Sequence, residues 1–411
     1  MSQRIVIIGT GFAGVWSALS AQRLIDTQGR SAAIEITVIA PDPTLVIRPR
    51  LYEAKPSSMT FALEPLFESA GIKFIRGFVD QIEAAEHTLH FTSTESGKAN
   101  ISFDRLILAA GSDVIRPDSV AGLQEHAFDI DTLNAAVKLE AHLEKLATAP
   151  ESDARNTIVV CGAGFTGIEI VTELPKRLAH MVTKPRLILV DSDEVLASRL
   201  GPGPRPIITQ AIKELNIEVK LGSKVTAVDA QGVTLASGEH IASQTVIWTA
   251  GVRATPLARQ ISGNVDTLGR LYADKHLRVP SQKHIFATGD AAAAETDNEG
   301  HYTMMSCQHA IPLGRASGFN AAADLLGEPM VEYSQPEYIC CLDLGAWGTV
   351  VTKGWEREVK ITGELAKKVK QGINRELIYP PKSASQALEL AQPLLQPSLD
   401  EVSARLLGTA M

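Results

Sequence analysis

The sequence predicts an α/β protein in which one strand, turn and helix unit occurs twice. Arg4 to Val15 (RIVIIGTGFAGV) joins a β-branched run to a glycine-rich turn, and the spacing of apolar residues then becomes helical. Thr157 to Glu169 (TIVVCGAGFTGIE) repeats this arrangement. A strand pattern that ends in small residues also occurs twice, at Phe103 to Gly111 and at Thr245 to Gly251. The two duplications predict two similar α/β units.

The glycines of both turns have the spacing GxGxxG, in which each position has its own physical role. The first glycine permits a tight turn, the second lets a pyrophosphate approach the backbone, and the third lets the helix pack on the strand. Free N–H groups and the helix dipole then face the phosphates. The predicted contact residues are Gly9, Gly11, Phe12, Ala13 and Gly14 in the first turn and Gly162, Gly164, Phe165 and Gly167 in the second. Two copies in this context predict two Rossmann-like dinucleotide sites.

Length and composition narrow the class of protein. The chain has 411 residues, 45% of them hydrophobic, and a formal net charge of −8. This length allows two or three domains, and an acidic balance without a basic block argues against nucleic acid as a partner. No apolar run approaches the roughly 18 residues that span a bilayer, and Met1 to Arg4 shows no signal-peptide pattern. We therefore expect a cytoplasmic protein.

The four cysteines predict neither a disulfide scaffold nor a metal site. They form no CxxC pair and no cluster with metal-ligand spacing. They are Cys161, Cys307, Cys340 and Cys341.

The second strand of the first unit, Ile34 to Ile39, ends where dinucleotide-binding proteins carry an acidic residue for a ribose hydroxyl. This chain has Ala40 at that place. Asp42 lies two residues later in a PDP turn, which does not fix the direction of its carboxylate. The residue that replaces the acidic ribose ligand stays open.

The next stretch, Arg48 to Glu53 (RPRLYE), resembles a segment of the type II NADH dehydrogenases. By this resemblance the chain is identified as a type II NADH dehydrogenase-like member of the FAD-dependent pyridine nucleotide-disulfide oxidoreductase superfamily. The segment runs close to the flavin in that family, which implies FAD as a cofactor with Arg48 and Pro49 beside it. On the residues alone, a proline-bounded loop that buries Leu51 is the alternative.

The ends of other predicted strands resemble the same family. Gly71 to Val79 reads as a strand, and the resemblance implies that the backbone of Val79 meets the adenine end of FAD. The family's strand-ending ATG element is written here Ala109-Ala110-Gly111, which implies that Ala110 and Gly111 approach a cofactor. The second version of this element ends in Ala250 and Gly251.

The second nucleotide unit follows a predicted helix, Asp131 to Ala147, and a polar linker, Thr148 to Asn156. The apolar residues expected on one face of that helix are Leu133, Val137, Leu143 and Leu146. Asp191 ends the predicted strand Leu187 to Val190, where a carboxylate accepts hydrogen bonds from a ribose 2′-hydroxyl and repels a 2′-phosphate. We therefore expect NADH, and Arg199 keeps NADPH as the alternative.

Gly289 and Asp290 end the strand predicted for His284 to Asp290. The resemblance assigns Asp290 to the ribitol or phosphate part of FAD. Because this strand follows the complete second nucleotide unit, an interrupted first domain resumes here. The predicted domains are an FAD-binding domain at 1–115 and 265–325, an NAD(P)H-binding domain at 116–264, and a small α+β C-terminal interface domain at 326–411.

The stretch Ser306 to Ala323 predicts a helix that begins near the flavin ring. Free N–H groups at its N-terminus can stabilise negative charge on the pyrimidine side of the ring. The contact residues expected there are Gln308, His309 and Ala310. Type II NADH dehydrogenases usually carry an AQxAxQ pattern here, and this chain has Pro312 in place of the second glutamine. Since that pattern is associated with the quinone pocket, the departure weakens the quinone assignment more than the flavin assignment.

The C-terminal region predicts strands from Val331 to Trp355, then an amphipathic helix from Glu364 to Leu377, and a tail with short helices after Pro380. Cys340 and Cys341 are neighbours in a strand, so their side chains should face opposite sides. The helix is expected to place Leu365, Val369, Ile373 and Leu377 on one side and Lys367, Lys368 and Lys370 among its polar positions. It either packs on its own domain or lies on an anionic membrane surface.

The predicted reaction is transfer of a hydride from bound nicotinamide to FAD, followed by transfer of electrons to a quinone-type acceptor. The cofactors carry this chemistry, and hydride transfer itself needs no general base. Glu169 is the polar residue expected near the nicotinamide and the flavin, as in the family's GxGxxGxE. A salt bridge at the start of a helix is its structural alternative.

Two other functions remain open. One is a soluble NADH-dependent reductase of a small redox protein or an organic acceptor. The other is a nicotinamide-responsive flavoprotein resembling apoptosis-inducing-factor relatives. The absence of cysteines before Cys161 excludes the CxxxxC pair of disulfide reductases, and Cys161 inside a strand does not suit a sulfide:quinone oxidoreductase. The expected partners are NADH and an electron acceptor. Peripheral contact with the inner face of the cell membrane and a homodimer also stay open.

Overall fold

The computed structural model describes residues 2–407, and its core consists of two separate β-sheets with parallel central strands. This confirms the predicted α/β fold class. In each sheet the strand that leads into a glycine-rich turn lies in the middle, with neighbours on both sides. Because the chain crosses to opposite sides of that strand, a crevice forms at its carboxyl end, where open α/β sheets bind ligands.

The first sheet has the strand order β19-β20-β8-β1-β2-β5-β6-β7. Its bounds are β1 Gln3–Ile8, β2 Ile34–Ala40, β5 Lys73–Glu83, β6 Thr88–Ser93, β7 Gly97–Ser102, β8 Arg105–Leu108, β19 Arg278–Val279 and β20 Gln282–Ala287. Ile5, Val6 and Ile7 are fully buried, as expected of a strand covered on both faces. β20 pairs with β8, so the chain returns to the first sheet after completing the second. This return agrees with a split first domain, whose bounds stay a prediction.

The second sheet has the order β12-β11-β10-β16, and all of its pairs are parallel. Its bounds are β10 Thr157–Cys161, β11 Arg186–Val190, β12 Ile217–Lys220 and β16 Thr245–Trp248. The smaller strands are β3 Thr44–Val46, β4 Thr60–Ala62, β9 Ser112–Val114, β13 Val225–Asp229, β14 Gly232–Leu235, β15 His240–Ala242, β17 Val252–Ala254, β18 Leu271–Tyr272 and β21 Ala292–Ala293. β17 pairs with β9 and thereby joins the second nucleotide unit to the first.

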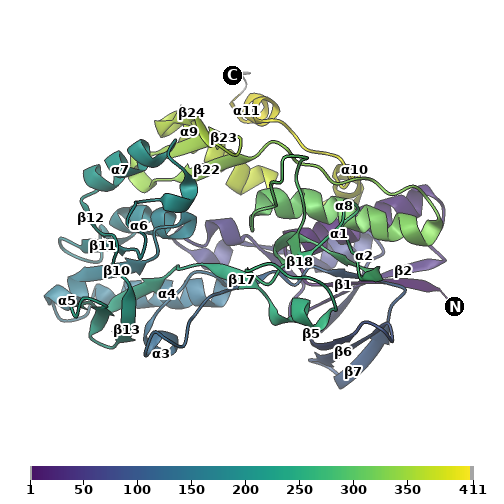
Figure 1. Ribbon diagram of the computed structural model, residues 1–411, viewed down its shortest axis with the longest axis horizontal. Coiled ribbons are helices and arrows are strands. Elements are labelled where there is room, and N and C mark those ends of the chain that lie inside the picture. The colour runs from purple at the N-terminus through teal and green to yellow at the C-terminus, as the bar shows by residue number, and fades with distance from the viewer. Residues whose placement is uncertain (1, 408–411) are drawn as a thin grey trace.

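The helices and the C-terminal sheet enclose these two sheets. The helices are α1 Phe12–Thr27, α2 Glu64–Ser69, α3 Leu123–His126, α4 Leu133–Leu146, α5 Asp153–Asn156, α6 Phe165–Leu178, α7 Arg205–Glu214, α8 Cys307–Leu326, α9 Gly363–Gly372, α10 Ala384–Leu390 and α11 Leu399–Leu407. The C-terminal sheet consists of β22 Ile339–Asp343, β23 Thr349–Lys353 and β24 Glu358–Thr362. Figure 1 shows the first sheet with α1 and α8 at one end of the molecule, the second with α6 and α7 at the other, and the C-terminal sheet above.

Helices α1 and α8 pack closely against each other. An added Cβ at Gly314 or Gly318 of α8 would overlap the carbonyl oxygen of Ala13 or Ser17, respectively. The hydroxyl groups of Ser17 and Ser317 form a hydrogen bond of 3.0 Å. This packing brings the N-terminus of α8 to the first glycine-rich turn.

The predicted apolar face of α4 is wrong at Val137, which is 38% exposed. The buried residues of α4 are Ala136, Leu139, Leu143 and Leu146. Val137 follows Ala136 by one residue, which turns its side chain about 100° away from that face. The predicted polar linker is also partly helical, since it contains α5. The side chain of Arg155 in α5 donates a hydrogen bond of 2.8 Å to the carbonyl oxygen of Leu146 at the end of α4.

The helix predicted for Glu364 to Leu377 forms α9 and then a π-helical turn at Ile373–Leu377. Leu365 is 46% exposed, so the predicted apolar side is wrong at that residue, whereas Val369 of the same side is buried. Lys370, predicted among the polar positions, is buried as well. The helix packs against β23 of its own domain, as one of the two alternatives expected. Between residues 2 and 407, no helix has the length and apolar character needed to cross a membrane.

Candidate active site

Both glycine-rich turns open onto one cavity of about 1840 Å³. Gly11 and Phe12 line it from the first turn, Gly164 and Phe165 line it from the second, and Lys370 lines it from the C-terminal domain. Pockets for single drug-sized ligands measure about 300–1,000 Å³. The cavity therefore has room for more than one such ligand.

The first glycine of each turn has a backbone conformation that only glycine adopts readily. Gly9 has φ = 108° and Gly162 has φ = 113°. The third glycine of each turn is packed tightly, because an added Cβ at Gly14 or Gly167 would overlap the carbonyl oxygen of Gly9 or Gly162, respectively. Turn and packing therefore follow the roles that the spacing predicts.

The middle glycines, Gly11 and Gly164, have neither constraint. Each has a φ that any residue adopts, −68° and −78°, and an added Cβ would meet nothing within 4 Å. Among the glycines between residues 2 and 407, only these two combine an ordinary φ with open space. Neither turn geometry nor packing explains glycine at these positions. A ligand that approaches the backbone explains it, and both turns therefore fit a dinucleotide pyrophosphate.

Most of the predicted site residues line this cavity. They are Gly11, Phe12, Ala13, Arg48, Pro49, Gly111, Gly162, Gly164, Phe165, Glu169, Asp191, Ala250, Gly251, Gly289, Asp290, Gln308 and Ala310. Gly289 shows how closely they converge, because an added Cβ there would lie 2.7 Å from Cβ of Ala13 and 3.8 Å from Cβ of Ala310. Segments from both parts of the split first unit thus line one cavity.

Six predicted residues do not line the cavity: Gly9, Gly14, Val79, Ala110, Gly167 and His309. The three glycines among them hold the turns together as described above. Val79 pairs with Phe91 in the antiparallel β5–β6 ladder, away from the cavity wall. His309 is fully buried.

Arg48 and Asp290 meet at the cavity wall, as the resemblance implies for neighbours of one cofactor. Arg48 Nη1 lies 3.3 Å from Asp290 Oδ2, and its Nη2 pairs with Asp131. The Ser112 hydroxyl donates to Asp290 Oδ2 at 2.6 Å and accepts from Arg48 Nη1 at 2.9 Å. The cluster fixes the Arg48 guanidinium between two carboxylates.

The carboxylate of Asp191 faces its own glycine-rich turn. It accepts hydrogen bonds from the N–H of Ala163 and, at 2.7 Å, from the N–H of Asp193. In the first unit Ala40 is buried, and Asp42 instead pairs with Arg76 at 2.8 Å outside the cavity lining. Only the second unit therefore presents an acidic side chain at the position expected for a ribose ligand.

Glu169, in the second turn of α6, forms a buried ion pair with the C-terminal domain. Its Oε1 lies 3.0 Å from Nζ of Lys370 and accepts the backbone N–H of Asp343 at 3.0 Å. Burial raises the pKa of the Glu169 carboxyl to about 7, although Lys370 lowers it. Burial lowers the pKa of the Lys370 ammonium, but the Glu169 carboxylate raises it above its ordinary value. Glu169 can therefore change protonation near neutral pH while Lys370 stays charged.

A second pair lies beside the first. Lys367 Nζ lies 2.5 Å from Asp343 Oδ1, and the Tyr52 hydroxyl donates to Asp343 Oδ2 at 3.0 Å. The hydrogen bond from Tyr52 connects the segment after Arg48 to the C-terminal domain. Sequence reasoning missed Tyr52, Asp131, Asp343, Lys367 and Lys370 as functional candidates. Only the RPRLYE resemblance gave any signal for one of them, Tyr52.

The first turn of α8 is shaped by Pro312. Proline lacks an N–H, so the carbonyl oxygen of Gln308, four residues earlier, loses its helical partner. The side chain of Gln335 supplies a donor instead, at 3.2 Å. The side-chain amide of Gln308 pairs with both backbone groups of Ile339 in β22. These contacts attach the C-terminal sheet to the start of α8.

His309 and the cysteines are held in unreactive states. Nδ1 of His309 accepts the N–H of Met304 at 3.0 Å, the ring stacks on Tyr338 with centroids 5.1 Å apart, and burial lowers its pKa to about 3. Burial raises the pKa of the Cys161 thiol to about 12 and that of Cys307 to about 11. Cys340 and Cys341 are adjacent in β22, and each is a free thiol.

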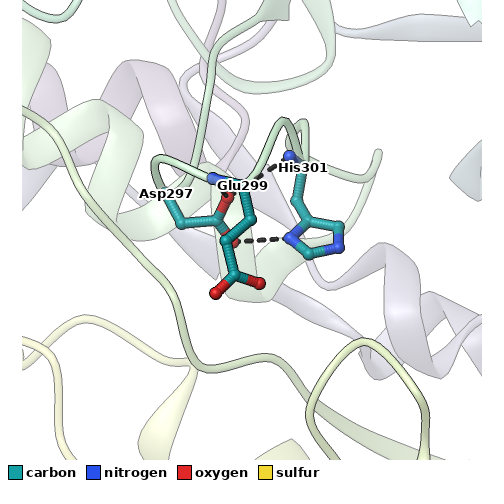
Figure 2. Close-up of side chains that lie close together, drawn as sticks. All are labelled: Asp297, Glu299 and His301. Carbon is teal, nitrogen blue, oxygen red and sulfur yellow. Dashed lines mark hydrogen bonds and ion pairs between the residues drawn. The ribbon is translucent and has the colours of Figure 1, made fainter.

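One loop outside the cavity brings together Asp297, Glu299 and His301 (Figure 2). Asp297 Oδ2 lies 2.7 Å from Nδ1 of His301, while Oδ1 accepts the N–H of Glu299 at 2.8 Å. The polar atoms of Asp297 are thus engaged in holding the turn. The His301 ring also stacks on Trp355, with centroids 4.7 Å apart. The group is best explained as a loop-stabilising network.

Known proteins resemble this chain over most of its length. Residues 3–314 match the family described as pyridine nucleotide-disulphide oxidoreductase. An NADH dehydrogenase-like protein of Mycobacterium tuberculosis is 42% identical over 402 residues, covering 96% of this chain and 99% of that protein. A type II NADH:quinone oxidoreductase of Staphylococcus epidermidis is 26% identical over 398 residues, covering 92% and 95%. A structure of NDH2 from Plasmodium falciparum in complex with NADH shares the fold, with a TM-score of 0.76 at 13% identity over 95% of this chain and 97% of that one.

Proposed function

Because the chain is an oxidoreductase that belongs to the pyridine nucleotide-disulphide oxidoreductase family, we propose that it oxidises NADH and passes the electrons through FAD to a quinone-type acceptor. Membership of this family implies binding of a flavin and a pyridine nucleotide. The choice of FAD, NADH and a quinone is our proposal. In it, residues 1–115 and 265–325 hold FAD and residues 116–264 hold NADH.

One observation carries the proposal: two glycine-rich turns, each open at its middle glycine, face a single cavity. The N-termini of α1 and α6 direct free N–H groups at the two pyrophosphates. Bound there, the flavin and the nicotinamide supply the hydride chemistry. The protein holds their rings together and excludes water. Holding the rings together needs two sites on one cleft, and hydride transfer needs no general base.

Glu169 has the role of holding a proton in this proposal. Reduction of a quinone by NADH (NADH + H⁺ + quinone → NAD⁺ + quinol) takes up one proton besides the hydride, so the acceptor needs a proton source at the cavity. Glu169 lines the cavity, and its pKa of about 7 keeps a proton available on Oε at neutral pH. Lys370 positions that carboxyl and offsets its charge after the proton leaves.

The direct test is stopped-flow reduction of the purified flavoprotein by NADH and by NADPH, followed by mixing with a short-chain quinone. We expect NADH to bleach the flavin rapidly and the quinone to restore the colour within seconds. If the flavin is bleached but only a soluble redox protein restores it, the quinone assignment is wrong. If the reduced protein persists with nicotinamide bound and no acceptor restores it, the nicotinamide-responsive alternative replaces both.

Asp191→Asn is expected to reduce the preference for NADH over NADPH by about tenfold, because it removes one charge that repels a 2′-phosphate. Asparagine keeps the size of the side chain and one oxygen acceptor, so the turn at Ala163 should persist. The measurement is kcat/KM for both nucleotides. Glu194→Gln removes the same charge from an exposed neighbour outside the cavity lining and serves as the control. An unchanged ratio in Asp191→Asn would show that Asp191 does not face the ribose.

A further inference from the structure

We propose that Asn374 is the residue whose side-chain amide hydrogen-bonds and orients a carbonyl oxygen of the acceptor. The inference rests on the proposed reduction of a quinone-type acceptor and names a residue that recognises it. On α8, Pro312 offers a ligand in the cavity neither an N–H nor a side-chain amide. An apolar ring with carbonyl oxygens needs a donor to fix its orientation in an apolar pocket.

Four amide side chains line the cavity, and three of them are engaged. The Gln308 amide pairs with both backbone groups of Ile339. Nε2 of Gln335 donates to the carbonyl oxygen of Gln308, and Oε1 accepts the hydroxyl of Tyr333 at 2.8 Å. Nε2 of Gln396 donates to the carbonyl oxygen of Ser334 at 2.8 Å. These three have their bonds within the protein.

Asn374 differs from them. Its residue is only 3% exposed, and its Nδ2 has no hydrogen-bond partner among residues 2–407. A buried donor without a partner costs about 1–3 kcal/mol. A half-turn of the amide gives up no protein hydrogen bond of Nδ2 and directs the NH₂ group into the cavity. A ligand oxygen there would satisfy the donor.

The backbone at Asn374 is also unusual. It lies in the π-helical turn Ile373–Leu377, directly after α9. Single π-helical turns are frequent at functional sites. Lys370 lies about one helical turn earlier, so its side chain and that of Asn374 project from neighbouring positions on one face. An oxygen held by Asn374 would therefore lie beside the Lys370–Glu169 pair, which holds the proton that the acceptor takes up.

Apolar residues from three segments line the cavity together with Asn374. The apolar residues that line the cavity from α8, the π-helical turn and the tail are Ile311, Ile373, Leu377, Ile378, Leu395 and Leu399. Arg315 Nη1 donates to the carbonyl oxygen of Leu395 at 2.9 Å and so ties the tail to α8. Arg50 Nη1 lies 3.1 Å from the hydroxyl of Tyr379 and ties the segment after the π-helical turn to the first domain. This pocket suits an uncharged ring that carries carbonyl groups.

The test compares Asn374→Leu with the wild-type flavoprotein, using 2-methyl-1,4-naphthoquinone as the acceptor. Leucine keeps the volume and removes the donor. We expect kcat/KM for the quinone to fall about tenfold to a hundredfold, mainly through KM. Bleaching by NADH and reduction of ferricyanide, which needs no oriented carbonyl, should not change. Asn374→Ser retains a donor and should recover part of the loss. Gln386→Leu also replaces a side-chain amide by leucine, at an exposed position of α10 outside the cavity lining, and should behave as wild type.

Binding is measured independently of turnover, by quenching of flavin fluorescence in the oxidised protein with the same quinone. We expect the dissociation constant of the quinone to be larger in Asn374→Leu by a similar factor. If Asn374→Leu binds and reduces the quinone like wild type, the role of Asn374 is wrong and the proposed function stands. If the wild type reduces ferricyanide but not the quinone, the proposed function fails, and this inference fails with it.

Discussion

Gly164→Val is expected to give a yellow, folded protein that NADH no longer bleaches, and Gly11→Val a folded protein without flavin. Both glycines begin a helix with a φ that valine adopts, and an added Cβ meets no protein atom within 4 Å. The new side chain therefore projects only into the space where a pyrophosphate would approach the backbone. A displacement of about 1 Å in a bound reactant can cost about a hundredfold in rate, so we expect at least that loss for NADH.

Each of these variants is the control for the other. Flavin content is read from the visible spectrum, folding from circular dichroism, and nucleotide binding from the rate of bleaching at increasing NADH. The assignment of the first turn to FAD and the second to NADH requires the two defects to separate. If Gly164→Val loses its flavin, or Gly11→Val keeps it, the two turns have been assigned to the wrong cofactors.

The glycine-rich turns and their strands could be predicted because their causes are local. A β-branched run, a glycine with positive φ and a helix that packs on the strand all lie within fifteen residues, and the same pattern occurs twice. The return of the chain at β20 was predicted from position, because a strand followed by Gly289 and Asp290 comes after the complete second nucleotide unit. Local chemistry therefore predicted the fold class and the two glycine-rich turns that line the cavity, whereas Arg48, Pro49 and Gln308 rest on the family resemblance.

The burial of Lys370 at the cavity could not be predicted, because the residue that pairs with it lies in another domain. Helical periodicity alone assigns a lysine to the solvent and Leu365 to the core. Leu365 is exposed instead, and Lys370 is buried because it pairs with the buried Glu169 carboxylate, about 200 residues earlier in the sequence, where an unpaired charge would be costly. The role of Asp131 could not be predicted for the same reason, because its partner Arg48 comes from a separate segment of the chain. Side chains that act in pairs across domains give no periodic signal in one sequence.

The Glu169–Lys370 pair leads to the last prediction. Quinone reduction should depend on a group with a pKa of about 7, with high activity below that pH and falling activity above it, because Glu169 donates a proton only in its protonated form. Glu169→Gln keeps an acceptor for the N–H of Asp343 but has no proton to lose. We expect its rate of flavin reoxidation by quinone to fall about a hundredfold and its pH transition near 7 to disappear. Bleaching by NADH, which needs no general acid, should be nearly unchanged.

Lys370→Met separates a proton-holding role from a merely structural one. Lys370 lowers the pKa of Glu169, so its removal should shift the pH transition upward and extend activity to higher pH, even if the maximal rate falls. Lys368→Met removes a lysine from the exposed side of the same helix and should leave the pH profile in place. If Glu169→Gln retains the transition near 7, another group supplies the proton. If Lys370→Met shifts the transition downward, Glu169 is not the group that titrates, because loss of a neighbouring positive charge can only raise the pKa of a carboxyl group.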